Sequence, residues 1–307
     1  DLQAQIVRLQ DEAFDAVIAF GGGSAMDAAK VLNVGLAPEC RGHSLASLLD
    51  DPARFAAART RPLYSVPTTA GTGSEVTPFA TVWDHERKKK LSLAGPAVWP
   101  TAAFVDAALT DSVPPEATIS TGLDAINQAA ESIWNRNANP ITLGYSVRAL
   151  QLGFAALPRI ADGEGGEADR DQMAEASLLA GLAISHTRTA LCHSISYPIT
   201  AHFGVSHGLA CAFTMPAVLC HNLQAEDGRF KRLAAALNGG ESSHAALSGH
   251  FEALIRAMGV REKVRRQVPS FAQLKAVASD MYTPGRADNN LVAVDDAEIE
   301  KILSSAW

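Results

Sequence analysis

The fold of the first third of this chain is decided by the stretch Phe14-Asp15-Ala16-Val17-Ile18-Ala19-Phe20-Gly21-Gly22-Gly23-Ser24. Its first seven residues are typical of a buried strand, its glycines break that strand, and residues 25–34 have helical composition. A glycine turn at the carboxyl end of a strand lets the backbone approach a pyrophosphate, and the N–H groups of the following helix favour the anion. Flexible turns also use such a run, which differs from the Gly-x-Gly-x-x-Gly fingerprint. The stretch therefore predicts half of an α/β nucleotide fold.

A second segment dense in hydroxyl groups follows another expected strand at residues 63–66. It runs Val66-Pro67-Thr68-Thr69-Ala70-Gly71-Thr72-Gly73-Ser74-Glu75-Val76. Such a loop can surround phosphate or ribose oxygens. A helix start capped by Thr72 or Ser74 is the simpler interpretation, but it accounts for only part of the run. Two such loops after successive strands favour a nucleotide site.

The remaining pattern divides the chain into two domains. Further strands are expected at 79–83 and 102–106, and the basic run 87–90 is interpreted as a solvated hairpin turn in preference to an anion site. After Pro114-Pro115 the segments are amphipathic or rich in small residues, with a connecting loop at 163–167, which predicts an all-helical domain. We therefore expect an α/β dinucleotide-binding domain at 1–112 and a helical domain at 113–307.

Composition excludes several classes of protein. Hydrophobic residues make up 47% of the 307 and charged residues only 19%, so substantial buried surface is expected. The formal charge of -7 argues against nucleic acid as a partner. No stretch approaches the roughly 18 apolar residues of a membrane span, and the four cysteines show no Cys-x-x-Cys spacing, which favours a reducing, cytoplasmic setting.

Four residues of the expected helical domain form a candidate metal site. Asp124 and Gln128 are four apart and project from one helical face, where a carboxylate and an amide oxygen could share a cation. His193 and His207 lie fourteen apart around a turn at Gly204. An ordinary hydrogen bond and satisfied core histidines are the alternatives, but imidazoles with a carboxylate are typical of Fe²⁺ or Zn²⁺ sites.

Together these motifs resemble the iron-containing (group III) alcohol dehydrogenases across nearly the whole chain. The resemblance rests on Gly-Gly-Gly-Ser-x-x-Asp-x-x-Lys at 21–30, Pro-Thr-Thr-Ala-Gly-Thr-Gly-Ser-Glu at 67–75, Gly-Leu-Asp-Ala at 122–125 and His207-Gly208. It implies a dehydroquinate synthase-like plan, with a Rossmann-like NAD or NADP domain that lacks its first strands here, and a helical metal and substrate domain. It also implies a homodimer, and it places the residue that selects NAD or NADP before the glycine turn, outside this sequence.

The resemblance assigns roles to individual residues. Those implied to hold the cofactor are Gly22, Gly23 and Ser24 at the pyrophosphate, Thr68, Thr69 and Thr72 around the nucleotide, and Asp27 and Lys90 along the nicotinamide side. Asp124, His193 and His207 match three of the family's four metal ligands, with Fe²⁺ as the expected ion and Zn²⁺ as the alternative. The fourth ligand is a histidine in most members and Gln128 here, a poorer donor for a transition metal.

Two further positions suggest a branch within the family. Tyr197 stands where many relatives carry an active-site histidine, and either Tyr197 or His202 could relay protons instead. The surroundings of Gln128, Arg188 and Tyr197 resemble the phosphonoacetaldehyde reductase (hydroxyethylphosphonate dehydrogenase) branch. Arg188, five residues before His193, offers a bidentate fork for a phosphonate, unless it pairs with a local acid.

The expected activity is reduction of a small aldehyde by NAD(P)H, with the metal as a Lewis acid on the carbonyl. Three alternatives are considered. One is a metal-independent reductase that resembles maleylacetate reductases, the second is a lyase that resembles dehydroquinate synthase, and the third is a non-catalytic chain. Metal analysis distinguishes the metal-independent reductase from the expected enzyme, and net consumption of NADH distinguishes the lyase. Enzymatic turnover would exclude a non-catalytic chain.

Overall fold

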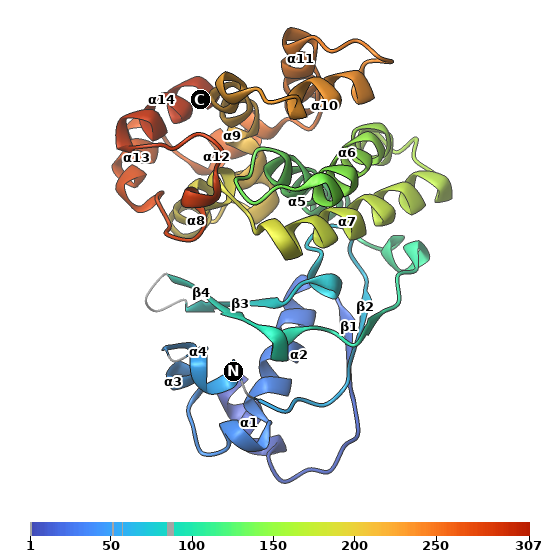
Figure 1. Ribbon diagram of the computed structural model, residues 1–307, viewed down its shortest axis with the longest axis vertical. Helices are drawn as coiled ribbons and strands as arrows, with labels where there is room; N and C mark the ends of the chain where they lie inside the picture. The colour runs from blue at the N-terminus through green and yellow to red at the C-terminus, as the bar shows by residue number, and fades with distance from the viewer. Residues whose placement is uncertain (1, 51, 57, 85–88) are drawn as a thin grey trace.

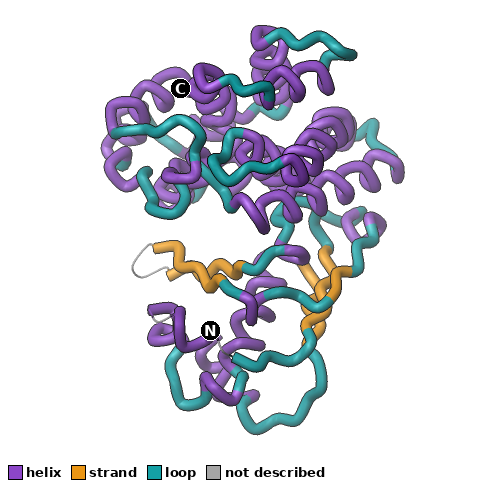
Figure 2. Tube along the Cα trace, viewed as in Figure 1, coloured by secondary structure: helices purple, strands orange, loops and turns teal. Residues whose placement is uncertain are grey.

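A computed structural model describes residues 2–50, 52–56, 58–84 and 89–307 of the chain. Figure 1 shows two parts, with all the strands on one side and the helices from α5 onward on the other. The strands are confined to the part formed by the first 103 residues (Figure 2). The expected combination of an α/β part and an all-helical part is therefore confirmed.

The α/β part is built on a small parallel sheet. Its strands are β1 (Val17–Gly21), β2 (Leu63–Pro67) and β5 (Ala102–Ala103), in the order β1-β2-β5. The register pairs Val17 with Leu63 and Gly21 with Pro67, so the glycine turn and the hydroxyl-rich loop leave the sheet at the same edge. This shared edge brings the two predicted phosphate-binding segments together.

Helices and a hairpin complete the α/β part, and the helix at residues 23–35 packs on β1 and β2. The helices are α1 (Leu2–Leu9), α2 (Gly23–Gly35), α3 (Leu45–Asp50) and α4 (Pro52–Ala56), and the antiparallel hairpin joins β3 (Phe79–Asp84) to β4 (Lys89–Ala94). The expected turn at the basic run 87–90 is not tested, because residues 85–88 and the side chains of residues 89 and 90 lie outside the described part of the chain. Two expected strands are shorter than predicted, since β1 begins at Val17 rather than at residue 14 and β5 covers only residues 102–103.

The helical part surrounds one central helix, α5 (Pro115–Ile133). The helices around and beyond it are α6 (Pro140–Ala161), α7 (Glu167–Thr187), α8 (Leu191–Phe203), α9 (His207–Asn222), α10 (Arg229–Leu237), α11 (His244–Ala257), α12 (Val260–Gln267), α13 (Phe271–Ala276) and α14 (Asp296–Ala306). Every residue from 122 to 133 is buried, because α6, α7 and α9 pack around α5. Polar groups on α5 are therefore held in the interior, where each needs a partner.

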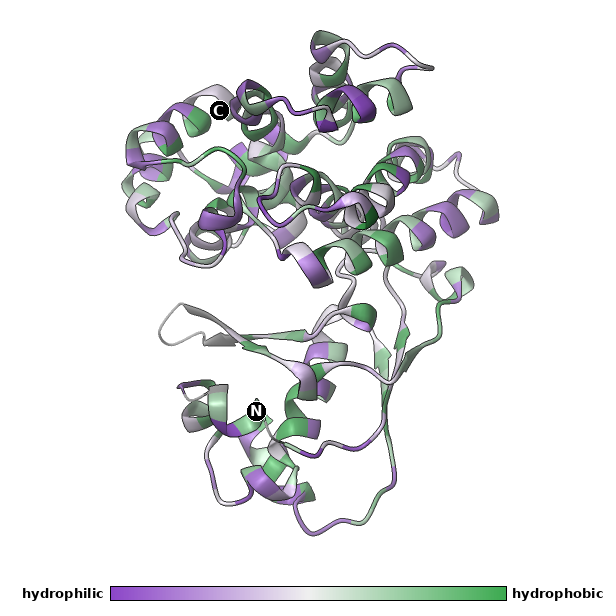
Figure 3. Cartoon of the chain, viewed as in Figure 1, coloured by the Kyte–Doolittle hydropathy of each residue, from purple (hydrophilic) through white to green (hydrophobic). Residues whose placement is uncertain are grey.

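The core is divided in the same way. One continuous cluster of buried apolar side chains runs through the helical part, whereas the α/β part has two smaller clusters. Hydrophobic residues follow the packed helices and also β1 and β2 (Figure 3). Among the described residues, no helix combines the length and the apolar character required to cross a bilayer.

Candidate active site

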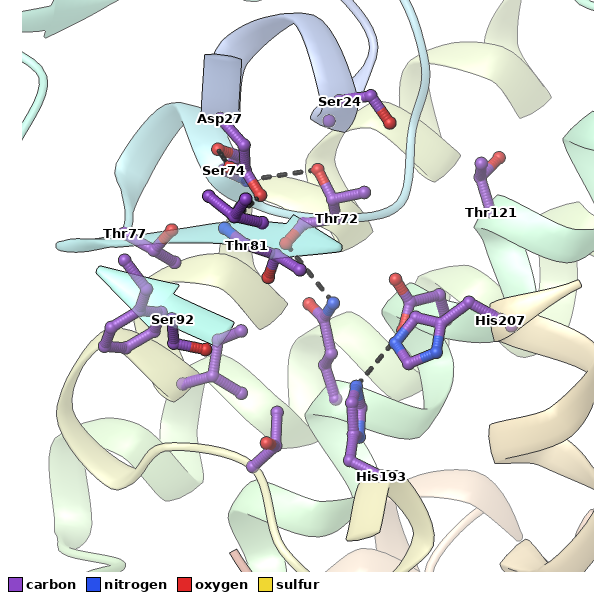
Figure 4. A pocket seen from close by; sticks show the side chains of 18 of the residues that line it. Ser24, Asp27, Thr72, Ser74, Thr77, Thr81, Ser92, Thr121, His193 and His207 are labelled. Atoms are coloured by element: carbon purple, nitrogen blue, oxygen red, sulfur yellow. Dashed lines mark hydrogen bonds and ion pairs between the residues drawn. The ribbon is translucent and has the colours of Figure 1, made fainter. Parts of the chain in front are cut away.

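Three of the four predicted metal ligands converge in the helical part. One donor atom each from Asp124, His193, His207 and Cys211 lies within 4.8 Å of the donor atoms of the other three. His193 Nε2 is 3.3 Å from Asp124 Oδ1, and the two histidine rings meet edge to face with their centroids 5.2 Å apart. Figure 4 shows His193 and His207 side by side. A carboxylate with two imidazoles in a buried cluster fits a divalent transition metal.

A close crossing of two helices places His207 against Asp124. A Cβ added to Gly208 would lie 1.7 Å from the carbonyl oxygen of Ser120 and 3.1 Å from the backbone nitrogen of Asp124. Only a glycine lets the first turn of α9 approach α5 so closely. The His207-Gly208 pair therefore combines a ligand with the packing residue that delivers it.

Glu131 orients His193 from the opposite side. The ring Nδ1 of His193 lies 2.7 Å from Glu131 Oε2, and the carboxylate also accepts hydrogen bonds from the backbone N–H groups of His193 at 3.1 Å and Ala190 at 2.8 Å. Glu131 is fully buried and lies seven residues, or about two helical turns, after Asp124. A carboxylate that holds Nδ1–H fixes the tautomer and leaves Nε2 to face the cluster.

The electrostatics of the cluster favour a cation. Burial alone would lower the pKa of His193, but Cys211, Glu131 and Asp124 surround the ring and raise that pKa well above its ordinary value. Burial raises the pKa of the Cys211 thiol, and the neighbouring His193 opposes that increase. The pocket thus stabilises positive charge at the point where the donor atoms meet.

Gln128, the predicted fourth ligand, lies in the same cavity but is oriented by another contact. Its Nε2 donates to the carbonyl oxygen of Thr72 at 3.2 Å, which ties α5 to the hydroxyl-rich loop. Its Oε1 is buried and has no hydrogen-bond partner within the described part of the chain. The assignment of Gln128 to the metal stays a prediction.

The two predicted nucleotide segments pack directly on each other. Thr68 N–H donates to the carbonyl of Gly21 at 3.0 Å. A Cβ on Gly22 would lie 3.3 Å from the side chain of Thr69, and a Cβ on Gly23 would lie 2.5 Å from that of Thr72. The turn is therefore packed tightly against side chains of the hydroxyl-rich loop, and its glycines leave bare backbone at the start of α2.

Polar atoms at this turn suit a phosphorylated ligand. Gly22 caps α2 without a side chain, so the N–H groups at the start of this helix face the turn. The Oγ1 of Thr69 is buried with no hydrogen-bond partner among the residues that the structure describes. Gly23, Ser24 and Thr72 all line the cavity, and Figure 4 shows Ser24 and Thr72 at its edge. A dinucleotide pyrophosphate matches these donors.

Asp27 has a structural task as well as a place in the cavity wall. Its carboxylate accepts hydrogen bonds from Ser74 Oγ at 2.6 Å and from Thr81 N–H at 2.8 Å, which joins α2 to the loop and to β3. Lys30, one turn later, donates to the carbonyls of Thr77 at 2.8 Å and Phe79 at 2.7 Å. The resemblance placed Asp27 and Lys90 beside the nicotinamide; Lys90 lies in β4, and its side chain is outside the described part.

One cavity of about 470 Å³ joins the nucleotide segments to the metal cluster. Its wall includes Ser24, Asp27 and Thr72 from the α/β part and Asp124, Gln128, His193, Tyr197 and His207 from the helical part. The two parts meet beside it, where Gly73 packs on Gly181 so closely that a Cβ on Gly73 would lie 2.5 Å from the Cα of Gly181. The cavity has the size and the position expected for a cofactor and a small substrate.

The two candidates for proton transfer separate in the structure. The ring of Tyr197 stacks on that of His207 at a centroid distance of 6.1 Å and lines the cavity. His202 is exposed in the last turn of α8, against Phe203. The structure therefore brings Tyr197, but not His202, to the site, because a separation of five positions along the helix turns His202 to its outer face.

Arginines line the cavity beyond the cluster. Arg188 follows α7 with φ 62° and ψ 175°, a conformation that side-chain-bearing residues rarely adopt, and its carbonyl accepts a hydrogen bond from Asn135 Nδ2 at 3.2 Å. Arg286, from the segment before α14, lies in the same wall. Over the described ranges, neither arginine forms an ion pair with an acid, so the local partner considered for Arg188 is not found. Both charges are available to an anionic ligand.

Sequence reasoning missed three residues of this site. Glu131 carried a signal, because it is seven residues after Asp124 and so falls on the same helical face. Cys211 is four residues after His207, which also predicts one face, but the cysteines were interpreted only through their lack of Cys-x-x-Cys spacing. Arg286 had no such signal, since only the tertiary fold brings its loop to the cavity.

Comparison with known proteins places these features in a family. Residues 1–107 match the family model described as iron-containing alcohol dehydrogenase, and residues 118–307 match the C-terminal model of the Fe-containing alcohol dehydrogenase family. The chain is 33% identical to a phosphonoacetaldehyde reductase of Streptomyces viridochromogenes, over 94% of this chain and 75% of that protein. It is 36% identical to the probable alcohol dehydrogenase EutG of Salmonella typhimurium, over 79% of this chain and 60% of that protein.

Solved structures give the same result. A sulfoacetaldehyde reductase from Bifidobacterium kashiwanohense, in complex with NAD⁺, superposes with a TM-score of 0.86 at 28% identity and covers 99% of this chain and 79% of that one. A 1,3-propanediol oxidoreductase has a TM-score of 0.88 at 25% identity, with 100% and 80% coverage. The matched region is thus about 60% to 80% of the length of these relatives.

Proposed function

Because the chain belongs to the iron-containing alcohol dehydrogenase family, we propose that it is an NAD(P)H-dependent reductase of a short aldehyde that carries a phosphonate or sulfonate group. One observation carries this proposal. A single cavity is lined by the glycine turn, by the Asp124, His193 and His207 cluster, and by two arginines without acidic partners among the described residues. In this proposal the glycine turn binds the cofactor, the cluster lies at the reacting carbonyl, and the arginines bind the anionic group of the substrate.

The names of similar proteins support the anionic substrate. One relative is a phosphonoacetaldehyde reductase and one structural neighbour is a sulfoacetaldehyde reductase bound to NAD⁺. Both names describe a two-carbon aldehyde with a tetrahedral oxyanion. The arginine pair matches that shared chemistry, because a guanidinium can donate two parallel hydrogen bonds to such a group.

The chain's own residues have separable tasks in the reduction. When bound, a divalent cation would supply Lewis-acid polarisation of the carbonyl, and the reduced nicotinamide would supply the hydride. Asp124, His193 and His207 would hold the cation, and Glu131 would hold His193 in the required tautomer. The start of α2 and the hydroxyls of the facing loop would bind the pyrophosphate and so fix the ring over the substrate.

Tyr197 is the candidate proton donor. Its ring is stacked on His207 at the cavity wall, so a substrate bound at the cluster would lie beside this phenol. A phenol can deliver a proton to that oxygen when it is within hydrogen-bond reach. Replacement of Tyr197 by Phe keeps the stacking and removes only this proton.

Arg188 and Arg286 would bind the oxyanion of the substrate. The rare backbone conformation of Arg188 is maintained by Asn135 and by Thr187, whose Oγ1 donates to the Arg188 carbonyl at 3.0 Å. Such strain persists only where the surroundings enforce it, and it is concentrated at functional sites. Here it sets the direction in which the side chain leaves the backbone at the cavity.

The test is a coupled assay that follows oxidation of NADH and of NADPH with phosphonoacetaldehyde, sulfoacetaldehyde and uncharged acetaldehyde. Arg286→Gln should raise KM for the two anionic substrates by roughly 10- to 100-fold, because a charge-assisted hydrogen bond contributes about 1.5 to 3 kcal/mol. The uncharged aldehyde should be reduced as before. Arg148→Gln, which removes a surface arginine paired with Glu175 at 3.1 Å, is the matched control. Equal kcat/KM for charged and uncharged aldehydes would remove the anionic substrate from the proposal.

A further inference from the structure

Cys211 lies in the wall of the metal cluster. It is fully buried on α9, one helical turn after His207, and its Sγ is 3.8 Å from each ring nitrogen of His207. It also interacts with the side chains of His193 and Ser196. The thiol therefore faces the same point as the carboxylate and the two imidazoles.

Two of the separations in this cluster are close to those between ligands of a tetrahedral ion. With metal–nitrogen bonds near 2.0 Å and metal–sulfur bonds near 2.3 Å, neighbouring nitrogen and sulfur ligands are separated by about 3.5 Å, and nitrogen and oxygen ligands by about 3.3 Å. The observed separations are 3.8 Å from Cys211 Sγ to His207 and 3.3 Å from His193 Nε2 to Asp124 Oδ1. Shifts of a few tenths of an ångström would bring these pairs to ligand spacing.

Gln128 is less suited to be the fourth ligand. Its amide is oriented by the hydrogen bond to the Thr72 carbonyl, on the side of the cofactor loop. An amide oxygen is also a weak donor for Fe²⁺, Co²⁺ or Zn²⁺, whereas a thiolate is a strong one. Donor chemistry therefore favours the sulfur.

We propose that the Cys211 thiolate is the fourth protein ligand of the divalent metal, together with Asp124, His193 and His207. The inference rests on the metal site of the proposed function. Coordination replaces the thiol S–H bond with a sulfur–metal bond, and the proton leaves to solvent without any change of oxidation state. The resulting donor set favours Zn²⁺, Fe²⁺ or Co²⁺ over Mg²⁺ and Mn²⁺.

The first measurement uses the unmodified chain. X-ray absorption of the zinc-loaded protein should show one sulfur neighbour at about 2.3 Å, and the cobalt-loaded protein should show a thiolate-to-cobalt charge-transfer band in the near ultraviolet. Bound zinc with only nitrogen and oxygen neighbours would overturn the proposal. That outcome would leave aldehyde reduction intact, whereas a chain that binds neither ion would contradict the metal site itself.

Variants then separate Cys211 from its neighbours. Cys211→Ser should lose the cobalt band and weaken cobalt binding by roughly 100-fold, because removal of a ligand exceeds the loss seen for its hydrogen-bond partners. Cys192→Ser removes another buried thiol, which lies outside the four-residue cluster, and should keep the band. Gln128→Ala should keep it as well. A band that survives Cys211→Ser but disappears in Gln128→Ala or Cys192→Ser would refute the assignment.

Discussion

The helical part and the α/β part contribute to the same cavity with very different degrees of burial. In the helical part, Asp124, Glu131 and His193 lie within a core that is continuous from α5 to α14. In the α/β part, β1 leaves Ile18 70% exposed and Phe20 61% exposed, and its apolar clusters are small. The candidate metal ligands are thus enclosed by packed helices, while the glycine turn is held by contacts with the facing loop. Changes in the helical part should therefore affect chemistry or folding, and changes in the α/β part should affect cofactor binding.

The largest effect is expected from His193→Ala. The variant loses the ligand that Glu131 orients, so kcat/KM should fall by about 1000-fold, the scale observed when one electrostatic stabiliser of a reacting oxygen is removed. Steady-state NAD(P)H oxidation measures the loss, and fluorescence titration should show unchanged cofactor binding. His202→Ala, on the exposed side of the same helix, is the control. Normal turnover and metal content in His193→Ala would show that the helical part does not supply the metal chemistry.

Gly208→Ala tests whether the close contact between α9 and α5 is rigid. The new Cβ would meet the Ser120 carbonyl, a backbone atom that cannot rotate away, so the free energy of unfolding should fall by about 3 kcal/mol. Urea denaturation measures it. Gly249→Ala on α11 is the matched control, because its Cβ has no neighbour within 4 Å and the change should stabilise the helix by up to about 1 kcal/mol. Equal stability of the two variants would contradict the tight packing.

A pH dependence is expected from Lys30 in the α/β part. Burial, opposed by the charges of Asp27 and Glu75, lowers the pKa of Lys30 from 10.5 to about 8. Below pH 8 both folded and unfolded chains hold this proton, and the cost of burying the charge is fully present. Between about pH 8 and 10.5 the unfolded chain binds more protons, so this group raises stability as pH rises, by about 3 kcal/mol in all.

The measurement is urea unfolding across that pH range for the unmodified chain and for Lys30→Met. The difference between their free energies of unfolding isolates Lys30 from other groups that titrate at alkaline pH. Glu75 does not imitate the effect, because burial raises its pKa and its contribution falls as pH rises from its ordinary value of 4.5. A constant difference from pH 8 to 10.5 would mean that the ammonium is not desolvated.

Glu131→Gln should lower the affinity for the metal, with an effect of intermediate size. The amide keeps the shape of the side chain but replaces the carboxylate that faces His193 Nδ1 at 2.7 Å. Metal affinity should fall by about 10- to 100-fold, the usual cost of changing the hydrogen-bond partner of a ligand. Competition with a chelator measures it, and Glu175→Gln at the surface is the control. Unchanged affinity would reduce Glu131 to a structural role.

Parts of this site could be predicted from the sequence because they lie in local motifs. The glycine turn, the hydroxyl-rich loop and the candidate ligands Asp124, His193 and His207 belong to local motifs, whose spacing determines what one turn or one helical face can present. The paired ends of β1 and β2 then bring the two loops together at one edge of the sheet. Features that lie within one turn or one helix, or at the ends of successive strands, could therefore be predicted from the sequence.

Residues that depend on long-range packing were not predictable in this way. Arg286 reaches the cavity from a loop about 80 residues beyond His207, and no periodicity encodes that contact. His202 was considered because it is close in sequence to Tyr197, but the direction of a side chain on α8 depends on which face the neighbouring helices cover. The proximity of Cys211 to Asp124, His193 and His207 was hidden for a similar reason, because it depends on how α8 and α9 pack against α5.

The smallest effect is expected from Gly23→Ala, and its comparison with Gly208→Ala tests the difference between the two parts. A Cβ on Gly23 meets the Cγ2 of Thr72 at 2.5 Å, a side chain that can rotate, whereas the Cβ on Gly208 meets backbone. Gly23→Ala should therefore leave the free energy of unfolding nearly unchanged and weaken NADH binding by about 10-fold, because the methyl group occupies the approach of the pyrophosphate to α2. Combination with Thr72→Ser removes the nearest methyl group and should restore part of the affinity. If Gly23→Ala instead lowers the free energy of unfolding as much as Gly208→Ala does, the glycine turn is packed as rigidly as the helical core. The proposed difference in rigidity between the α/β part and the helical part would then be wrong.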